Sequence, residues 1–424
     1  MSLQITQYLK TNSLFEKHQS AYRQHHNTET ALIKITNDLL LSADDKKVSV
    51  LVLLDLSAAF DTIDHAILLT RLQKTFGLGG TVLNWFKSYL TNRVQCVKIN
   101  KTFSCDKPLL FGVPQGSVLG PLLYTLYTTP LGAIIRKHGL SYHFYADDSQ
   151  LYLCIDPENV HDLIFKVEIC VAEINEWMLV NKLKCNNDKT EAIFINPRNF
   201  KINCNSLMIG NENVTFAKSA KNLGVFIDAD LSMSSHISNL SKSVYMEIRR
   251  IKQVSKLVSE NCLKTLAVSF ILSKLDYCNA LFKNIQGYQI EKLQKLQNFA
   301  AKVVLGKSRF DHVTPCLIDL HWLPIGYRID FKIAVTVFKC LNNLAPPYLS
   351  ELIEIYTPSR SLRSSSLNLL TSKKTHYKTI GDKSFEYTAP LVWNKLPLYL
   401  RNEKSIDIFK NKLKTFYFNE AFFD

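Results

Sequence analysis

The segment Val48–Leu54 constrains the fold most, because it is an almost continuous run of β-branched and aliphatic residues, VSVLVLL, that ends at Asp55. Such a run is typical of a central strand buried on both faces of a sheet. It is far too short to cross a bilayer. A carboxylate at the end of a buried strand needs a chemical reason, so Asp55 is the first candidate site residue.

The composition indicates a globular chain with a polyanionic partner. With 424 residues and 46% hydrophobic content, the chain can form two or three packed units. Its net charge of +14 suits nucleic acid, although scattered lysines also serve solubility. The ten cysteines stand singly without zinc-site spacing, which predicts a reducing compartment, the nucleus or the cytoplasm. The N-terminus has no signal-peptide core, and we expect no membrane contact.

The periodicity of the first half predicts an α+β fold. Helices are expected over 28–41 after an N-cap at Asn27, and over 63–76, 82–90, 121–135 and 160–180. Strands are expected over 48–54, 95–99 and 191–195, with a hairpin over 142–153 whose tip is Ala146-Asp147-Asp148. This order indicates a sheet covered by helices.

The second half is different in pattern. Residues 234–344 are mostly helical in their periodicity and rich in Lys and Leu, which predicts a separate helical domain. Pro346-Pro347 and the Ser-rich, basic run 359–366 mark a further boundary. A final amphipathic helix is expected over 404–418.

Asp55 and the pair Asp147-Asp148 are candidate metal ligands. Phosphoryl transfer uses two divalent cations, and Mg²⁺ prefers carboxylate oxygens. Carboxylates placed close together in an apolar sheet destabilise the fold unless a cation lies between them. The alternative is that Asp55 caps a helix and the pair forms a turn, since Asp is common at both.

Three motifs in this order carry a family resemblance. DLSAAFD at 55–61, GVPQGSVLGPLLY at 112–124 and YADD at 145–148 resemble the reverse transcriptase domain of non-LTR (LINE-type) retrotransposons, and among them Jockey-like elements. The likeness begins at FEKHQSAYRQHHNTETAL, continues through LKCNNDKTE, NLGVFID and LDYCNALF, and reaches APLVWNKLP. It therefore covers nearly the whole chain and implies an RNA-directed DNA polymerase.

The resemblance implies a right-hand polymerase architecture. Residues 1–46 would be a remnant of the fingers, and 47–215 the palm, an antiparallel sheet with packed helices that holds the active site. Residues 216–345 would form the primer grip and a helical thumb, followed by a mixed C-terminal region, 346–424. Family members have more of the fingers and an endonuclease domain upstream, so we expect an N-terminally truncated chain.

The resemblance also gives roles to the acidic motif residues and their neighbours. Asp55, Asp147 and Asp148 would be catalytic metal ligands, together with the backbone carbonyl of Leu56. Phe60 would exclude a 2′-hydroxyl and so select deoxynucleotides, although aromatic side chains more often pack in cores. We expect Asp61 and Asp64 to be structural, bonding a turn and a helix start.

Further residues would contact the substrates. Pro114, Gln115 and Gly116 match the loop that supports the templating base and the incoming nucleotide. Lys189 resembles a lysine placed near the leaving phosphate, where a solvated lysine is the alternative. Leu223-Gly224-Val225 matches the turn that grips the primer end, and its alternative is an ordinary hairpin. Arg23 is a candidate contact for template phosphates, or simply a solvated side chain.

These assignments lead to one main hypothesis and two rivals. The main hypothesis is a reverse transcriptase that uses two Mg²⁺ ions, with Mn²⁺ as a substitute, an RNA template, a DNA primer and deoxynucleoside triphosphates. One rival is a catalytically inactive nucleic-acid-binding remnant that keeps the basic thumb. The other is a metal-dependent nuclease, against which Phe60 and the Pro114–Gly116 loop weigh, because hydrolysis needs neither.

Overall fold

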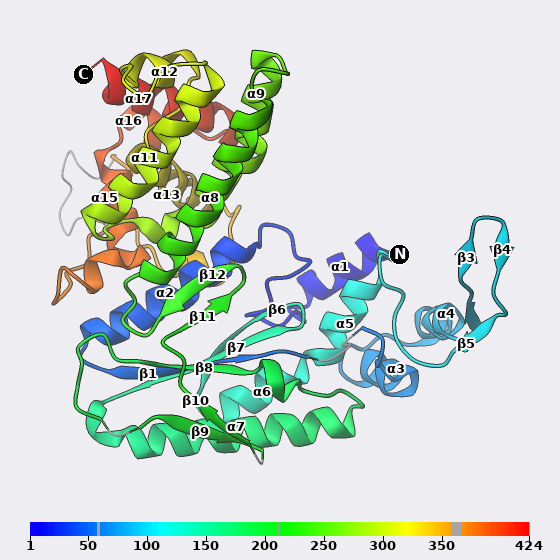
Figure 1. Ribbon diagram of the computed structural model, residues 1–424. Coiled ribbons are helices and arrows are strands. Elements are labelled where there is room, and N and C mark those ends of the chain that lie inside the picture. The colour runs from blue at the N-terminus through cyan, green and yellow to red at the C-terminus, as the bar shows by residue number, and fades with distance from the viewer. Residues whose placement is uncertain (57–59, 203, 211, 358–366, 424) are drawn as a thin grey trace. The chain divides into compact units, whose positions relative to one another are not determined.

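The computed structural model describes residues 1–56, 60–202, 204–210, 212–357 and 367–423 (Figure 1). The chain divides into two compact units. The first contains residues 1–24, 50–192 and 202–216, and the second contains 25–49, 193–201 and 217–424. The basic run 359–366, expected to mark a boundary, lies outside the described residues.

The main sheet, most of whose residues belong to the first unit, has the strand order β6-β7-β1-β8. Its strands are β1 (Val48–Leu54), β6 (Ser141–Tyr145), β7 (Asp148–Ile155) and β8 (Glu191–Ile195). The predicted central position of β1 is confirmed, because β7 and β8 flank it. Val50, Leu51 and Leu54 are buried, as a strand covered on both faces requires.

The hairpin β6–β7 was predicted over 142–153 and is confirmed. Its strands pair antiparallel, with Tyr145 opposite Asp148, so that Ala146 and Asp147 form a two-residue turn. Asp148 is therefore the first residue of β7 rather than part of the turn itself. Tyr142 and Phe144 are buried and anchor the strand that leads to the turn.

Helices surround this sheet. They are α1 (Ser2–Thr11), α3 (His65–Lys74), α4 (Gly80–Leu90), α5 (Gly120–Thr128), α6 (Pro130–Lys137) and α7 (Val160–Val180). Short 3₁₀ turns occupy Pro157–Asn159 and Asn187–Lys189. Helix α7 has the predicted bounds and runs along the sheet (Figure 1). Its apolar stripe includes Val167, Val171 and Ile174, which are buried.

Two sequence-based expectations for this unit were wrong in detail. The single helix expected over 121–135 is interrupted at Thr129, because Pro130 has no N–H with which to continue the helical hydrogen bonds. The strand expected over 95–99 is two short strands, β2 (Arg93–Gln95) and β3 (Lys98–Ile99). They pair with β5 (Lys107–Leu109) and β4 (Thr102–Phe103), respectively. A further hairpin joins β9 (Ser206–Ile209) to β10 (Glu212–Thr215).

The second unit is mostly helical, as the periodicity predicts. It contains the antiparallel strands β11 (Ser219–Asn222) and β12 (Val225–Asp228). Its helices are α2 (Thr28–Asp44), α8 (Ser234–Val254), α9 (Glu260–Ala267), α10 (Ser273–Asp276), α11 (Gly287–Val304), α12 (Thr314–Asp319), α13 (Ile325–Leu341), α14 (Pro347–Ser350), α15 (Phe385–Lys395), α16 (Leu398–Arg401) and α17 (Ile406–Phe422). A π-helical segment occupies Val268–Leu272, and 3₁₀ turns occupy Asn279–Phe282 and Gly381–Lys383.

One apolar core holds the second unit together. Phe282, Phe338 and Phe409 are fully buried in it, and Phe338 stacks on Phe409 with a centroid distance of 4.4 Å. The predicted N-cap of α2 is confirmed, because the Asn27 side chain accepts a hydrogen bond from the Thr30 amide at 2.8 Å. The last helix, α17, begins two residues later than expected and ends at Phe422. Within the described ranges, no helix is long and apolar enough to span a bilayer.

Candidate active site

Asp55 directly follows β1 and is tied to the segment that carries Lys189. The Asp55 carbonyl accepts a hydrogen bond from the Asn186 amide at 2.9 Å, and Leu56 forms an isolated bridge with Cys185. The Lys189 ammonium group lies 3.2 Å from the Asp55 carboxylate. The Asp55 side chain is 25% exposed and the Lys189 side chain 68%, so the ammonium group is the more solvent-exposed partner. Two predicted site residues thus lie in direct contact.

The hairpin β6–β7 supplies the other two carboxylates, Asp147 in its turn and Asp148 at the start of β7. Partial burial, followed by the charges of Asp147 and Asp55, raises the pKa of Asp148 to about 6 from its ordinary value of 3.8. Because Asp148 keeps an exposed surface, solvent screens part of this repulsion. The charges of Asp147 and Asp55 nevertheless act on the Asp148 carboxyl.

The carboxylates suit divalent cations without forming a closed cage. Among the residues that the structure describes, no group of three or more His, Cys, Asp or Glu side chains is arranged to hold a metal ion. Mg²⁺ at phosphoryl-transfer sites commonly takes one or two carboxylates and completes its shell with waters and substrate phosphates. Burial is the larger cause of the raised pKa of Asp148, and a cation would relieve the repulsion from Asp147 and Asp55 that adds to it. Asp55, Asp147 and Asp148 have the carboxylate chemistry that such an ion prefers, and their role as its ligands stays a prediction.

Gln19 holds the hairpin turn, and the sequence analysis did not single it out. Its side-chain oxygen accepts hydrogen bonds from the amides of Ala21 at 2.9 Å and Ala146 at 3.2 Å, and its side-chain nitrogen donates to the Ala146 carbonyl at 3.5 Å. Gln19 is only 4% exposed. Ala146 has φ = 56°, a conformation that strains a residue with a side chain. A buried amide thus supports the strained turn beside Asp147.

Phe60 is backed by a second aromatic residue. The ring of Phe60 stacks on that of Tyr124 with a centroid distance of 4.6 Å, and the Phe60 carbonyl accepts a hydrogen bond from the Val113 amide at 2.9 Å. Tyr124 lies on α5 and is fully buried. Burial, followed by the charge of Asp147, raises the pKa of the Tyr124 hydroxyl. The ring of Phe60, which is predicted to contact the sugar, is therefore held on one face by the ring of Tyr124.

The loop that contains Pro114, Gln115 and Gly116 lies against the segment after Phe60. Gly112 has φ = +83°, and a Cβ there would come within 2.9 Å of the Asp61 carbonyl, so only glycine allows this close approach. The Gln115 side chain donates to the Asp61 carboxylate at 3.0 Å. Gly116 also has a positive φ, +79°.

The two neighbouring acids have the structural contacts that were expected of them. Asp61 accepts the hydrogen bond from Gln115, across 54 residues of sequence. Asp64 caps α3, because its carboxylate accepts hydrogen bonds from the amides of Ala66 at 2.9 Å and Ile67 at 3.0 Å.

Arg23 folds back on its own segment. Its guanidinium donates to the carbonyls of Glu16 at 2.7 Å and Gln19 at 3.0 Å, and lies over the Phe15 ring. The described contacts of Arg23 therefore shape the loop that carries Gln19. Its predicted role at template phosphates stays a prediction.

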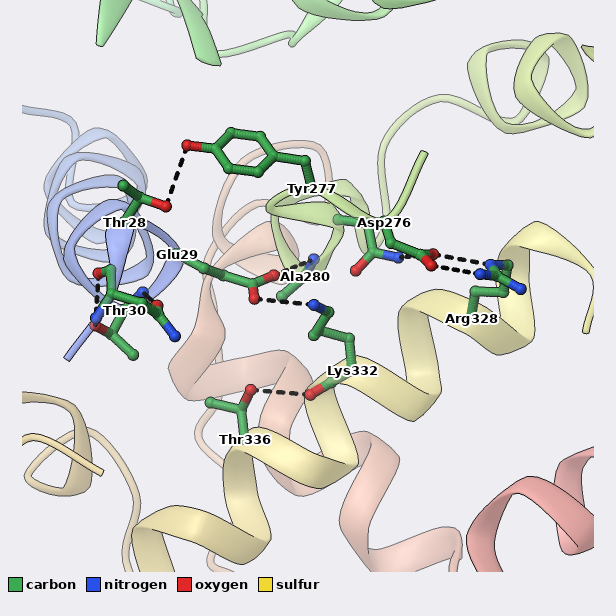
Figure 2. Close-up of polar contacts among 11 residues, drawn as sticks. Thr28, Glu29, Thr30, Asp276, Tyr277, Ala280, Arg328, Lys332 and Thr336 are labelled. Atoms are coloured by element: carbon green, nitrogen blue, oxygen red, sulfur yellow. Dashed lines mark hydrogen bonds and ion pairs between the residues drawn. The ribbon is translucent and has the colours of Figure 1, made fainter. Parts of the chain in front are cut away.

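In the second unit, the turn Leu223-Gly224 joins β11 to β12 and is held by Tyr277. Leu223 has φ = 45° and Gly224 has φ = 86°. The Tyr277 hydroxyl lies 2.6 Å from the Leu223 carbonyl, to which it donates, and 3.1 Å from the Thr28 hydroxyl on α2 (Figure 2). A Cβ at Gly224 would come within 3.2 Å of the Tyr277 ring. Tyr277 thus contacts both residues of the predicted primer-grip turn.

The segment around Tyr277 is itself fixed by charged contacts (Figure 2). Asp276 forms a two-pronged ion pair with the Arg328 guanidinium of α13. Glu29 on α2 accepts a hydrogen bond from the Ala280 amide at 3.3 Å and pairs with the Lys332 ammonium group at 3.3 Å. The segment that carries Tyr277 is therefore bonded to two helices, α13 through Asp276 and α2 through Ala280.

Carboxylate groups of this kind serve phosphoryl transfer, the class that includes polymerases and nucleases. The sequence comparison specifies the family: residues 1–227, more than half of the chain, match the model described as reverse transcriptase (RNA-dependent DNA polymerase). The chain belongs to the reverse transcriptase family.

Several transposon proteins are similar to the chain. The probable RNA-directed DNA polymerase from transposon X-element of Drosophila melanogaster is 25% identical over 82% of this chain and 37% of its own length. That from transposon BS of the same species is 27% identical over 70% and 32%. The RNA-directed DNA polymerase from mobile element jockey is 25% identical over 68% and 31%. The chain thus spans about a third of the length of these relatives.

Telomerase structures also align with the chain. Apo telomerase from Candida tropicalis aligns with a TM-score of 0.43 and 13% identity over 77% of this chain and 53% of its own. Telomerase from Candida albicans, in complex with a fragment of telomeric RNA, aligns with a TM-score of 0.38 and 14% identity over 75% and 52%.

Proposed function

We propose that this chain is an RNA-directed DNA polymerase of the non-LTR retrotransposon type, which extends a DNA primer on an RNA template with deoxynucleoside triphosphates. The observation that supports this proposal best is that the charges of Asp147 and Asp55 both act on Asp148, as expected if the acids of two separate motifs serve one site. Membership of the reverse transcriptase family supports the polymerase reading over hydrolysis. We expect such an enzyme to act in the nucleus or the cytoplasm.

Asp55, Asp147, Asp148 and the Leu56 carbonyl are the groups that would hold two Mg²⁺ ions, or Mn²⁺ in their place. Bound there, the ions would activate the primer 3′-hydroxyl and stabilise the leaving pyrophosphate. In the structure, the Lys189 ammonium group forms an ion pair with the Asp55 carboxylate at 3.2 Å. Its exposed ammonium group can turn from Asp55 toward the triphosphate, where a cation stabilises developing negative charge.

The neighbouring residues would position the nucleotide. Phe60, fixed by its stacking on Tyr124, presents a rigid ring that excludes a 2′-hydroxyl. Pro114, Gln115 and Gly116 would support the templating base, with Gln115 oriented by its hydrogen bond to Asp61. Arg23 would bind the template phosphates after its guanidinium gives up its hydrogen bonds to the carbonyls of Glu16 and Gln19.

The second unit would bind the duplex. Leu223 and Gly224 would grip the primer end, and the basic helix α8 would contact the duplex backbone without sequence choice. In this assignment residues 1–46 belong to the fingers, 47–215 to the palm, 216–345 to the primer grip and thumb, and 346–424 to the C-terminal region.

Primer extension tests the proposal. The purified chain is given a primed RNA template, deoxynucleotides and Mg²⁺, beside Asp147→Asn and, as a matched control, Asp162→Asn on the exposed face of α7. We expect extension by the parent chain and the control. Asp147→Asn should lose at least about a thousandfold, because each tenfold corresponds to about 1.4 kcal/mol and the cations supply several kcal/mol.

Two other outcomes would contradict the proposal. Salt-sensitive duplex binding with no extension by any variant would identify a catalytically inactive remnant. Cleavage of the template that is lost in Asp147→Asn, with no extension, would identify a nuclease.

A further inference from the structure

The segment between α4 and the Pro114 loop forms a projecting ribbon, defined here as residues 91–111. Strands β2 and β5 form its base and β3 and β4 its tip, and it extends away from the rest of the first unit (Figure 1). Every residue from 91 to 108 is exposed. The ribbon therefore contributes little to the core of its unit, and its side chains are available to a partner.

The exposed side chains of the ribbon are unusually apolar. They include Val94, Val97, Ile99, Phe103, Leu110 and Phe111, each more than half exposed. Isolated apolar side chains are normal on a surface, but a contiguous set marks an interaction site. Two of these six are aromatic and can stack on nucleobases.

The charge of the ribbon specifies the kind of partner. It carries Arg93, Lys98, Lys101 and Lys107 against the single acid Asp106, a net charge of +3. The Lys98 ammonium group lies 5.0 Å from the centre of the Phe103 ring. Cations interleaved with aromatic rings are the surface that single-stranded nucleic acid prefers, because phosphates meet the cations and bases stack on the rings.

A groove connects the ribbon with the predicted templating loop. It has a volume of about 730 Å³ and is lined by Arg93 and Gln95 at the ribbon and by Pro114 and Gln115 at the loop, with the Asp61 carboxylate in its wall. The Asp61 carboxylate accepts the hydrogen bond from Gln115. Because the amides of Gln95 and Gln115 each offer both donors and acceptors, they can bond any base edge without selecting one base.

We propose that the groove and the ribbon bind the unpaired RNA template strand on its way to the active site. This inference rests on the proposed polymerase function, because it assigns the strand that such an enzyme copies. Bases stack on Phe103 and Phe111, and the phosphates contact Lys98 and Arg93. The contact is independent of sequence, since neither stacking nor phosphate binding distinguishes the bases.

Template overhangs test the inference by binding alone. Fluorescence anisotropy compares a DNA–RNA primer–template with a single unpaired template nucleotide and one with about 12 unpaired nucleotides, a length within the range of single-strand sites. We expect the parent chain to bind the long overhang about tenfold more tightly. The double variant Phe103→Ala/Lys98→Ala should lose most of this gain and lower the salt slope by about 1.

A matched control and two contrary results make the test decisive. Phe165→Ala/Lys166→Ala on α7, where Phe165 is 63% exposed, removes the same two side-chain types elsewhere in the unit and should keep the gain. Equal affinity of the parent chain for both overhangs, or a gain that survives in the ribbon variant, would overturn the inference. If the parent chain is a dimer and the ribbon variant is a monomer, the surface instead binds a second copy of the chain, and the inference is overturned.

Failure of the proposed function gives a different result. If the parent chain shows no extension, but the overhang gain is present and depends on Phe103 and Lys98, the ribbon site holds and the polymerase proposal fails. If extension occurs without any overhang gain, only the ribbon inference fails.

Discussion

Two turns in this chain are held by distant side chains, one in each unit. The turn Ala146-Asp147 in the first unit is held by Gln19, and the turn Leu223-Gly224 in the second is held by Tyr277. Both turns contain backbone with positive φ, where residues other than glycine are strained. A turn of this kind keeps its shape only when its surroundings fix it.

Gln19 and Tyr277 differ in their burial and in the hydrogen bonds that they make to their turns. Gln19 is buried and makes three hydrogen bonds, two of them to Ala146, which has a side chain and so stores strain. Tyr277 is 39% exposed and makes one short bond to the Leu223 carbonyl, while Gly224 takes part of the positive-φ backbone at little cost. The comparison predicts that the first turn is more sensitive to losing its support.

Gln19→Ala should therefore have the largest effect. It leaves the buried amide of Ala21 and the half-buried amide of Ala146 without their acceptor, at about 1–3 kcal/mol for each unsatisfied group. We expect the free energy of unfolding to fall by about 2–4 kcal/mol in denaturant titrations, and primer extension to fall at least about tenfold. Gln73→Ala on the exposed face of α3 is the control. Unchanged extension in Gln19→Ala would show that the turn does not need this support.

Tyr277→Phe should have a smaller effect that is confined to the primer. It removes the hydrogen bond to the Leu223 carbonyl, about 1 kcal/mol, together with the contact to the Thr28 hydroxyl, and it keeps the ring. We expect KM for the primer–template to rise about fivefold, with KM for the deoxynucleotide unchanged. Tyr288→Phe on α11, an exposed tyrosine of the same unit, should behave like the parent chain. A rise in the deoxynucleotide KM instead would assign Tyr277 to another role.

The smallest expected effect is a pH dependence of folding stability that comes from Asp148, the residue after the first turn. The Asp148 carboxyl binds its proton more tightly in the folded chain than in the unfolded chain, because its pKa is raised to about 6 from 3.8. Stability therefore decreases as the pH rises through this window, and the decrease should be absent in Asp148→Asn. Melting curves without divalent cations at pH 4 and pH 7 measure this. If the melting temperatures of the parent chain and of Asp148→Asn change equally between pH 4 and pH 7, the pKa of Asp148 is not raised in the folded chain.

Strong local patterns predicted much of the fold from the sequence. The aliphatic run of β1, the long amphipathic stripe of α7 and the Asn27 cap each have a signal contained within a few residues. The interruption at Thr129 was missed because the apolar periodicity continues through Pro130, whose missing N–H outweighs it.

The supports of the candidate site could not be predicted in the same way. The motifs pointed to Asp55, Asp147 and Phe60, but Gln19, Tyr124 and Tyr277 act through contacts that depend on the folded chain. Gln19 reaches Ala146 across 127 residues, and Tyr277 reaches Leu223 across 54. No periodicity or turn chemistry reports a hydrogen bond over such separations, so only a signal that couples distant positions would have found them.

Binding of Mn²⁺ tests the central claim most directly, because Mn²⁺ is a paramagnetic substitute for Mg²⁺ at carboxylate sites. Titrations followed by electron paramagnetic resonance compare the parent chain with Asp55→Asn, Asp147→Asn and the control Asp162→Asn. The parent chain and the control should bind Mn²⁺ alike, and both site variants should bind it at least about tenfold more weakly, a loss of about 1.4 kcal/mol. Lys189→Ala, which frees Asp55 from its ion pair, should bind at least as tightly as the parent chain. Equal Mn²⁺ binding by the parent chain and both site variants would contradict a shared cation site at these aspartates.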